Sequence, residues 1–317
     1  MDVVSIGETM VALINEPRGY IRHAESFKPH IAGAESNTLI GLSRLGHQVS
    51  WISALGSDEL GELILRAVRA EGVDTSQVRR TEYRTGIFFK EILPNSNVSV
   101  TYYREGSAAS RMTGADLDFE QIRKAKVLYL TGITLAISDS ARKMLFEIVD
   151  RLKDEHVRVV FDPNIRLKLW SAEEARSTIL RFLPYVDDLI IGKAEAALLL
   201  GHHDPVRAIE DFKNIGCKNV VIKLGKEGAA YFVNGESGRV SNPQIFEEID
   251  PVGAGDAFSS GYVSGILNGK PPEQSVKEAC FLGGYITQFT GDYEGFPSRK
   301  QLSVLLKTIN SDETVER

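Results

Sequence analysis

Short apolar runs alternate with longer amphipathic segments along most of the chain. The runs lack the polar alternation of a half-exposed strand, which is typical of strands buried on both faces of a sheet. We expect such strands at residues 2–6, 49–55, 127–130, 157–161, 189–191 and 220–224. We expect helices that end at Gly46 and Gly72, and others at residues 138–153, 172–182, 194–200 and 204–214. Repeated strand–helix units predict an α/β fold with a mainly parallel sheet covered by helices on both faces, and ligands at the carboxyl ends of its strands.

Two segments interrupt this alternation. Residues 10–31 are mixed in character, and residues 85–104 contain two strand-like stretches, 87–89 and 98–103. The turn residues at 94–97 would join those two stretches into a hairpin. We therefore expect a single domain, residues 1–317, with a small β-sheet projecting from it that is formed by about 10–31 and 85–104.

The stretch 250–261 reads Asp-Pro-Val-Gly-Ala-Gly-Asp-Ala-Phe-Ser-Ser-Gly and comes where a helical pattern begins. Gly253 and Gly255 let the backbone turn tightly and approach a ligand, and the free N–H groups of a first helical turn favour an anion. A carboxylate beside such a nest, at Asp256, suits a base that takes a proton from a hydroxyl group attacking a bound phosphoryl group. The alternative is an Asp- and Gly-rich turn that only starts a helix. Neither the P-loop pattern nor the dinucleotide fingerprint fits, since Phe258 stands where the latter needs its third glycine.

The whole stretch resembles the second signature of the ribokinase-like carbohydrate kinases, and the resemblance extends from Gly7 to Pro297. It implies a three-layer αβα sandwich with a β-sheet lid, and phosphoryl transfer from ATP with Mg²⁺. In that family the residues matching Gly253, Ala254 and Gly255 stabilise the developing charge, and the residue matching Asp256 activates the sugar's primary hydroxyl. A requirement for a monovalent cation is left open.

Other segments match the family at its sugar and nucleotide sites. Gly33, Ala34 and Asn37 resemble the first signature, which contacts the sugar, although the same residues could simply cap a helix. Arg166 follows a predicted strand in the string Asp-Pro-Asn-x-Arg and is well placed to stabilise phosphate charge. The resemblance implies nucleotide contacts at a further set of positions: Asn164, Gly192, Lys223, Gly225, Gly228, Gly253, Gly255, Cys280 and Gly283. For the loop after Lys223, a plain hairpin between two strands is an equally good interpretation.

Three residues resemble the substrate site of one branch of the family, the 2-keto-3-deoxygluconate kinases. They are Tyr102, Arg104 and Asp292, and Phe88 occupies a fourth position of that site. The alternatives are exposed cross-strand pairs on the hairpin and, for Asp292, a loop after a helix. The chain departs from the family at Gly192, where many relatives have an asparagine near the triphosphate and Mg²⁺, although Glu195 is kept and would act on the metal through water. It also departs at Phe88, where some relatives have a tyrosine, and it matches only loosely from Cys280 to Gly284.

Composition and charge limit the partners. Of the 317 residues, 43% are hydrophobic and 25% charged, and the net charge of −6 argues against nucleic acid and anionic membranes as partners. Two cysteines make no disulfide framework, and no basic segment precedes an apolar run at the start. We therefore expect a cytoplasmic protein with a small-molecule substrate. Exposed lid strands often pair between subunits, so we also expect a homo-oligomer formed through the lid.

Three functions remain open from the sequence. The first is a kinase for a sugar acid, 2-keto-3-deoxygluconate, phosphorylated at its primary hydroxyl. The second is a kinase for a neutral sugar such as fructose. The third is a sugar-binding protein that has kept the fold but little catalysis.

Overall fold

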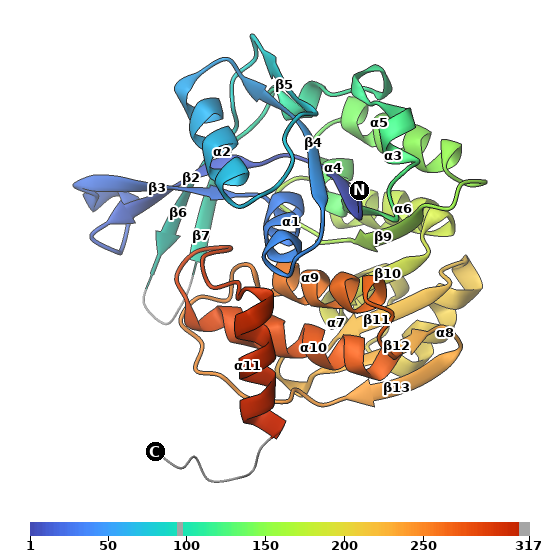
Figure 1. Ribbon diagram of the computed structural model, residues 1–317. Coiled ribbons are helices and arrows are strands. Elements are labelled where there is room, and N and C mark those ends of the chain that lie inside the picture. The colour runs from blue at the N-terminus through green and yellow to red at the C-terminus, as the bar shows by residue number, and fades with distance from the viewer. Residues whose placement is uncertain (94–97, 311–317) are drawn as a thin grey trace.

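A computed structural model describes residues 1–93 and 98–310 of the chain, and the turn expected at 94–97 lies outside these residues. In the described part, a nine-stranded sheet has the order β13-β12-β11-β10-β9-β8-β1-β4-β5, and a separate four-stranded sheet has the order β3-β2-β6-β7 (Figure 1). The pairs from β11 through to β5 are parallel, and the pairs β11–β12 and β12–β13 are antiparallel. The large sheet thus has the mainly parallel form that the alternating pattern predicts.

The elements have the following bounds. The strands of the large sheet are β1 (Val3–Ile6), β4 (Val49–Gly56), β5 (Val78–Thr81), β8 (Val127–Thr131), β9 (Arg158–Asp162), β10 (Asp188–Gly192), β11 (Asn219–Lys223), β12 (Ala229–Val233) and β13 (Glu236–Val240). Those of the small sheet are β2 (Met10–Glu16), β3 (Ser26–Ala32), β6 (Ile87–Ile92) and β7 (Val98–Tyr103). The helices are α1 (Ala34–Arg44), α2 (Glu59–Ala70), α3 (Phe119–Ile122), α4 (Gly132–Ala136), α5 (Asp139–Arg151), α6 (Ala172–Phe182), α7 (Lys193–Leu200), α8 (Pro205–Ile215), α9 (Ala254–Leu267), α10 (Pro272–Tyr285) and α11 (Arg299–Asn310).

Two layers of helices enclose the large sheet. Along β9, Val159 and Phe161 belong to a core cluster shared with α5, α6, α7 and α8, whereas Val160 belongs to a cluster shared with α1, α2, α9 and α10. Successive side chains of a strand point to opposite faces, so each buried strand contributes to both clusters. Figure 1 shows α1, α9 and α10 on the near side of the sheet. Because both faces are covered, its strands read as continuous apolar runs rather than alternating ones.

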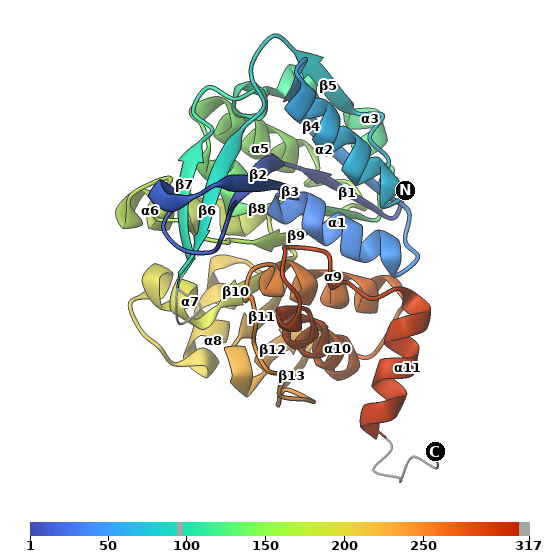
Figure 2. The same ribbon diagram turned by 90° about the vertical axis from the view of Figure 1, so that its left-hand side faces the viewer.

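The small sheet stands at the side of the main body (Figures 1 and 2). Its inner face carries a small buried cluster formed by Met10, Ala12, Ala32 and Phe88. Its strands lie in the two segments where the sequence predicts a projecting sheet. We refer to this four-stranded sheet as the lid.

Three strands of the large sheet have no counterpart among the predicted elements. β5 is short and carries two exposed arginines, Arg79 and Arg80, because it is an edge strand and needs no apolar run. β12 and β13 continue from β11 as antiparallel hairpins, so the plain-hairpin interpretation of the loop after Lys223 describes its backbone. None of the described helices combines the length and the apolar character needed to cross a lipid bilayer.

Candidate active site

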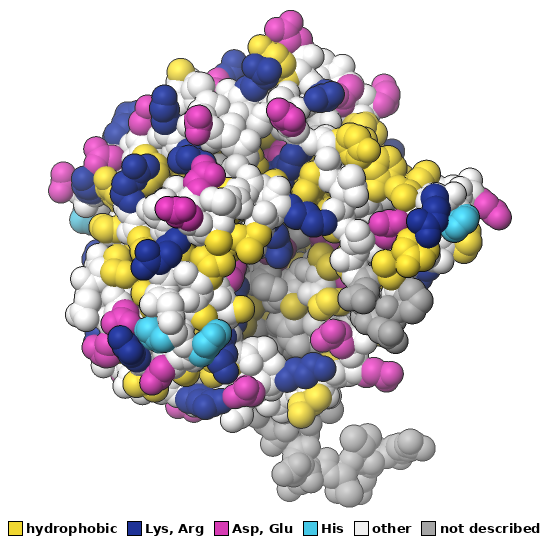
Figure 3. All heavy atoms as spheres, turned by 180° about the vertical axis from the view of Figure 1, so that it is seen from behind, with side chains coloured by type: hydrophobic (Ala, Val, Ile, Leu, Met, Phe, Trp, Pro, Cys, Tyr) yellow, Lys and Arg dark blue, Asp and Glu magenta, His cyan; other side chains and the backbone are white. Residues whose placement is uncertain are grey.

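Two adjoining cavities lie at the carboxyl ends of the parallel strands. The larger, about 800 Å³, lies between the lid and the main body, and the smaller, about 270 Å³, lies between the loop after β11 and helix α10. Figure 3 shows the molecule hollowed between lid and body. Lys223, Pro251 and Gly255 line both cavities, so the two spaces meet at the glycine stretch.

Helix α9 begins at this meeting point. Gly253 caps it with a φ of +82°, and a Cβ atom there would overlap the carbonyl oxygen of Asp292, so that only glycine fits. Gly253, Ala254 and Gly255, at the start of this turn, line the cavities. Asp256 is buried in the first turn of the helix, and its Oδ2 accepts a hydrogen bond from Nδ2 of Asn37 at 2.8 Å. The amide of Asn37 thus fixes the carboxyl group at the wall of the larger cavity.

The pKa of Asp256 is raised to about 7. Burial is the largest cause, and the nearby carboxylates Asp162 and Asp292 add to it, while the hydrogen bond from Asn37 and the charge of Arg166 oppose it. A carboxyl group with this pKa can hold and release a proton near neutral pH, as a general base must. The Oδ1 atom of Asn37 is buried without a hydrogen-bond partner in the described residues, and Asn37 lines the cavity, so a ligand donor could reach it.

A partly buried ion pair lies beside the glycine stretch. Nζ of Lys223, at the end of β11, donates to Oδ2 of Asp162, at the end of β9, at 2.6 Å. Burial alone would lower the pKa of Lys223, but Asp162 and Glu195 outweigh it and raise the pKa, so the amine keeps its charge. The sequence placed Asp162 next to the site without assigning it a role; the structure makes it the partner of Lys223.

Glu195 holds two loops together rather than standing free. Its Oε1 accepts the N–H of Ile165 at 2.6 Å and its Oε2 accepts the N–H of Gly192 at 2.8 Å. The side chain of Glu195 therefore lies beside Gly192, where a Cβ atom would come within 2.9 Å of its Oε2. Gly192 is the one predicted site residue that lines neither cavity, whereas Asn164, Arg166 and Glu195 line the larger one.

The predicted lid residues Phe88, Tyr102 and Arg104 all line the larger cavity, but Arg104 has a partner that the sequence did not reveal. Its Nε donates to Oε2 of Glu8 at 2.7 Å, and both side chains are buried. Glu8 belongs to the turn after β1, and its other oxygen, Oε1, is buried with no hydrogen-bond partner in the described residues. Arg104 is thus half of an ion pair with Glu8, and the two charges cancel each other at the wall of the cavity.

Lys90 is a second residue that the sequence analysis missed. It lines the larger cavity, its side chain is 2% exposed, and its Nζ lies 3.0 Å from Oδ2 of Asp250 and 3.6 Å from Oδ1 of Asp292. Burial raises the pKa of Asp292 to about 6, with Lys90 opposing and Asp250 adding to the rise. The period of two along β6 places Lys90 on the same face as Phe88, and this signal could have identified it.

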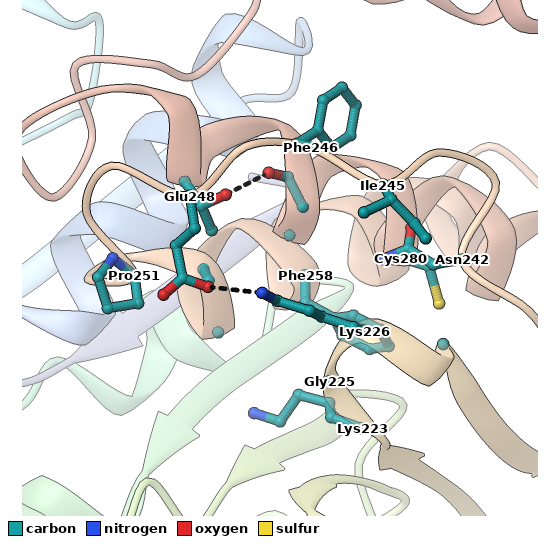
Figure 4. Close-up of a pocket in the computed structure, with 16 residues that line it drawn as sticks. Lys223, Gly225, Lys226, Asn242, Ile245, Phe246, Glu248, Pro251, Phe258 and Cys280 are labelled. Atoms are coloured by element: carbon teal, nitrogen blue, oxygen red, sulfur yellow. Dashed lines mark hydrogen bonds and ion pairs between the residues drawn. The ribbon is translucent and has the colours of Figure 1, made fainter. Parts of the chain in front are cut away.

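The smaller cavity has glycine backbone on two sides and apolar side chains between them (Figure 4). Gly228 has a φ of +99°, and a Cβ atom there would overlap the carbonyl oxygen of Val240. Gly225, Ala254, Cys280 and Gly283 line this cavity too. Phe246 and Phe258 add apolar surface, and Lys226 faces Glu248 at its rim. A narrow apolar space of this kind suits a flat heterocycle.

Gly33, Ala34, Asp256 and Asp292 line the larger cavity together with the residues described above. No group of three or more His, Cys, Asp or Glu side chains in the described residues is arranged to hold a metal ion. The arrangement can therefore bind a polar ligand under the lid, an anion at the start of α9 and a flat ring beyond it. Asp256 can take a proton from the polar ligand.

Comparisons with known proteins agree with this geometry. Residues 1–299 match the profile of the pfkB family carbohydrate kinases. The chain is 36% identical to the 2-dehydro-3-deoxygluconokinase of Bacillus subtilis (strain 168), over 96% of this chain and 95% of that protein, and 35% identical to that of Thermoproteus tenax, over 98% and 95%. The crystal structure of a PfkB protein from Polaromonas sp. JS666 superposes with a TM-score of 0.88 at 36% identity, over 96% of this chain and 99% of that one. The chain belongs to the pfkB family of carbohydrate kinases.

Proposed function

We propose that this kinase transfers the γ-phosphoryl group of ATP to the primary hydroxyl of 2-keto-3-deoxygluconate, also called 2-dehydro-3-deoxygluconate. The observation that carries the proposal is the buried Asp256, with a pKa of about 7, beside the first turn of α9 at the junction of the two cavities. The hydroxyl gives its proton to Asp256 while its oxygen bonds the γ-phosphorus, and the bond from phosphorus to the bridging oxygen breaks to release ADP. The N–H groups after Gly253 stabilise the charge that develops on the phosphoryl oxygens.

The chain would work as one kinase unit, with the lid closing over the sugar to exclude water. The proposed sugar contacts are Gly33, Ala34, Asn37, Phe88, Tyr102, Arg104, Arg166, Asp256 and Asp292. The proposed ATP contacts are Asn164, Gly192, Lys223, Gly225, Gly228, Gly253, Gly255, Cys280 and Gly283. All of them except Gly192 line one or both of the two adjoining cavities, which supports the proposal.

Mg²⁺ would neutralise charge on the triphosphate. This ion usually keeps several waters and takes one or two carboxylates besides substrate phosphates, so the lack of a three-ligand cluster in the described residues fits it. Glu195, whose two oxygens are already engaged with backbone N–H groups, would act on the metal's water shell. The need for a monovalent cation can be decided by assaying with and without K⁺.

A sugar acid is favoured by the cations that line the larger cavity and by the names of the two relatives. Arg104 is paired with Glu8, but the side chain of Arg166 is exposed at the rim and makes no hydrogen bond or ion pair within the described ranges, 1–93 and 98–310. A neutral-sugar kinase such as a fructokinase is the alternative.

The deciding assay measures kcat/KM for ATP consumption with 2-keto-3-deoxygluconate, 2-keto-3-deoxygalactonate, fructose and ribose. We expect the first to exceed fructose by at least about tenfold, the effect of one charged hydrogen bond; a preference for fructose would support the alternative.

A protein that binds sugars without catalysis is a further alternative. It predicts no phosphoryl transfer in a single turnover with enzyme in excess. Detection of one equivalent of sugar phosphate under these conditions would dispose of it.

Glu195→Gln should raise the Mg²⁺ concentration needed for half-maximal rate by about tenfold, a usual effect of losing an outer-shell carboxylate. The sugar KM should stay nearly unchanged, because Glu195 acts on the side of the triphosphate. A Mg²⁺ titration of parent and variant at saturating ATP measures this. Glu173→Gln, an exposed change on α6, is the matched control, and an unaltered titration in Glu195→Gln would contradict the role.

We propose that the outer face of the lid joins subunits. Phe27 and Tyr103 are 41% and 57% exposed there, and both rings contact Phe89, with centroids 5.3 and 5.6 Å apart. An exposed aromatic strip on a sheet is typical of an interface. Light scattering after size exclusion should show an oligomer that Phe27→Ser with Tyr103→Ser converts to monomer. Val206→Ser, an exposed apolar residue on α8, should leave it intact; a monomeric parent would refute the proposal.

We also propose a cytoplasmic location. Cys217 and Cys280 are both free and buried, which suits a reducing compartment. ATP is available in the same compartment.

A further inference from the structure

The side chain of Lys90 crosses from the lid into the main body. It leaves β6 on the inner face of the lid and ends between two carboxylates of the body, Asp250 and Asp292, with only 2% of its surface exposed. A buried charge is costly unless it is paired, so this lysine is stable in its position only while the lid lies against both carboxylates. We call Lys90, Asp250 and Asp292 the lid latch.

Both carboxylates of the lid latch belong to loops that shape the start of α9. Oδ1 of Asp250 accepts the N–H of Val252 at 3.1 Å, and its Oδ2 lies 3.4 Å from the N–H of Gly291. The carbonyl oxygen of Asp292 lies against Gly253, and this close approach is possible because Gly253 has no Cβ atom. The position of these two loops therefore sets the direction of the first N–H groups of the helix.

Further contacts join the lid to the second of these loops, residues 290–294. Nδ1 of His30 lies 2.9 Å from Oε1 of Glu294, and Nη2 of Arg18 lies 3.4 Å from Oγ1 of Thr290. Both contacts are exposed, so each contributes little by itself. They show that several lid segments converge on this loop and that, among the described lid residues, only Lys90 reaches it through a buried charge.

We propose that Lys90 is a positioning residue that couples closure of the lid to the shape of the phosphate-binding turn at 253–256. When the lid lifts, Asp250 and Asp292 lose the cation between them and repel each other across the loops that support Gly253. The turn then loses the geometry that stabilises phosphoryl transfer. The inference rests on the proposed function for its kinetic consequence, but its structural consequence holds for any acceptor. It explains how the enzyme avoids hydrolysing ATP while no sugar holds the lid down.

The first test uses the free protein and needs no substrate. In Lys90→Met, amide hydrogen exchange in residues 250–255 and 290–294 should be about tenfold faster than in the parent, because the local structure opens more readily. Lys28→Met makes the same chemical change at an exposed position on lid strand β3 and should leave both segments unchanged. Lys90→Arg, which keeps the charge, should restore much of the protection. Unchanged exchange in Lys90→Met would overturn the proposal.

The second test measures ATP consumed per sugar phosphate formed. The parent and Lys28→Met should give a ratio near one, and Lys90→Met should give a clearly higher ratio together with a lower kcat, while the ATP KM changes little. A purely structural role would lower stability without changing this ratio. A raised sugar KM with an unchanged ratio and unchanged exchange would make Lys90 a substrate ligand and refute coupling.

If Lys90→Met does not fold, a second variant still tests the proposal. Asp250→Asn removes the same ion pair from the body side and can still accept the Val252 N–H. It should reproduce the faster exchange at 292–294; Gly291 is left out of the comparison because its N–H loses its acceptor directly. If 2-keto-3-deoxygluconate is not the acceptor, the exchange results still stand, so failure of the coupling and failure of the proposed substrate are distinguishable.

Discussion

Asp256→Asn is expected to lower kcat by about a hundredfold or more, the usual range for loss of a general base. Asparagine keeps the size of the side chain and can still accept the hydrogen bond from Asn37, but it cannot take the proton of the attacking hydroxyl. ATP and sugar affinities, measured by calorimetry, should largely survive. Turnover near the parental rate would show that another group is the base.

The pH profile of the parent gives an independent check on the same residue. Only the ionised carboxylate accepts a proton, so kcat/KM should rise with pH through a pKa near 7 and level off above it. This acid limb should disappear from the residual activity of Asp256→Asn. Because burial raises the pKa of Asp256 from 3.8 to about 7, the parent loses stability as the pH rises between these two values, and the full loss is present above pH 7. The variant has no such ionisation and should melt at a higher temperature than the parent at pH 8. A limb that persists in the variant would belong to a different group.

Arg104→Ala is expected to reduce kcat/KM for 2-keto-3-deoxygluconate by about tenfold to a hundredfold while barely changing the ATP KM. Part of this effect comes from Glu8, because removal of Arg104 leaves a buried carboxylate facing an anionic substrate. Fructose carries no charge, so the kcat/KM for fructose should fall much less. If both substrates weaken equally, or the parent prefers fructose, Arg104 does not select a sugar acid.

Two further variants separate the causes. In the double variant Arg104→Ala with Glu8→Gln the repelling carboxylate is gone. The kcat/KM for 2-keto-3-deoxygluconate should therefore recover partly, while its ratio to the kcat/KM for fructose stays small. Arg166→Ala should lower kcat for both substrates, if this exposed arginine serves the transferred phosphate. A selective loss of the sugar acid in Arg166→Ala would instead make Arg166 the carboxylate partner. Melting temperatures must accompany these values, since breaking a buried pair also costs about 3–5 kcal/mol of stability.

Much of the main body could be predicted because the relevant signals are local. The run 127–130 has no charged residue, and β8, which begins with this run, contributes Leu128 and Leu130 to one core cluster and Val127 and Tyr129 to the other. Gly253 needs a left-handed backbone directly before a helix, and the sequence places a helix start there. These features depend on neighbours in the chain, which a single sequence displays.

The ion pairs of the site could not be predicted because they join distant positions. Glu8 and Arg104 are separated by 96 residues, and Lys90 and Asp250 by 160. No periodicity or spacing relates such residues; only the docking of the lid on the body brings them together. Glu195 is a mixed case. One of the N–H groups that hold its carboxylate belongs to Gly192, in its own segment, but the other belongs to Ile165, in a distant loop that the sequence does not connect with it.

The shared wall of the two cavities has a consequence for inhibition. Lys223, Pro251 and Gly255 line both spaces, so no partition separates the sugar end from the ring end. A single molecule with a polyhydroxy acid at one end and an adenosine oligophosphate at the other would occupy both. Binding of its second end would be intramolecular, with an effective concentration in the millimolar range, so its affinity should exceed that of either half by about 10²–10⁴. The length of linker that binds best would then measure the reach between the two substrates.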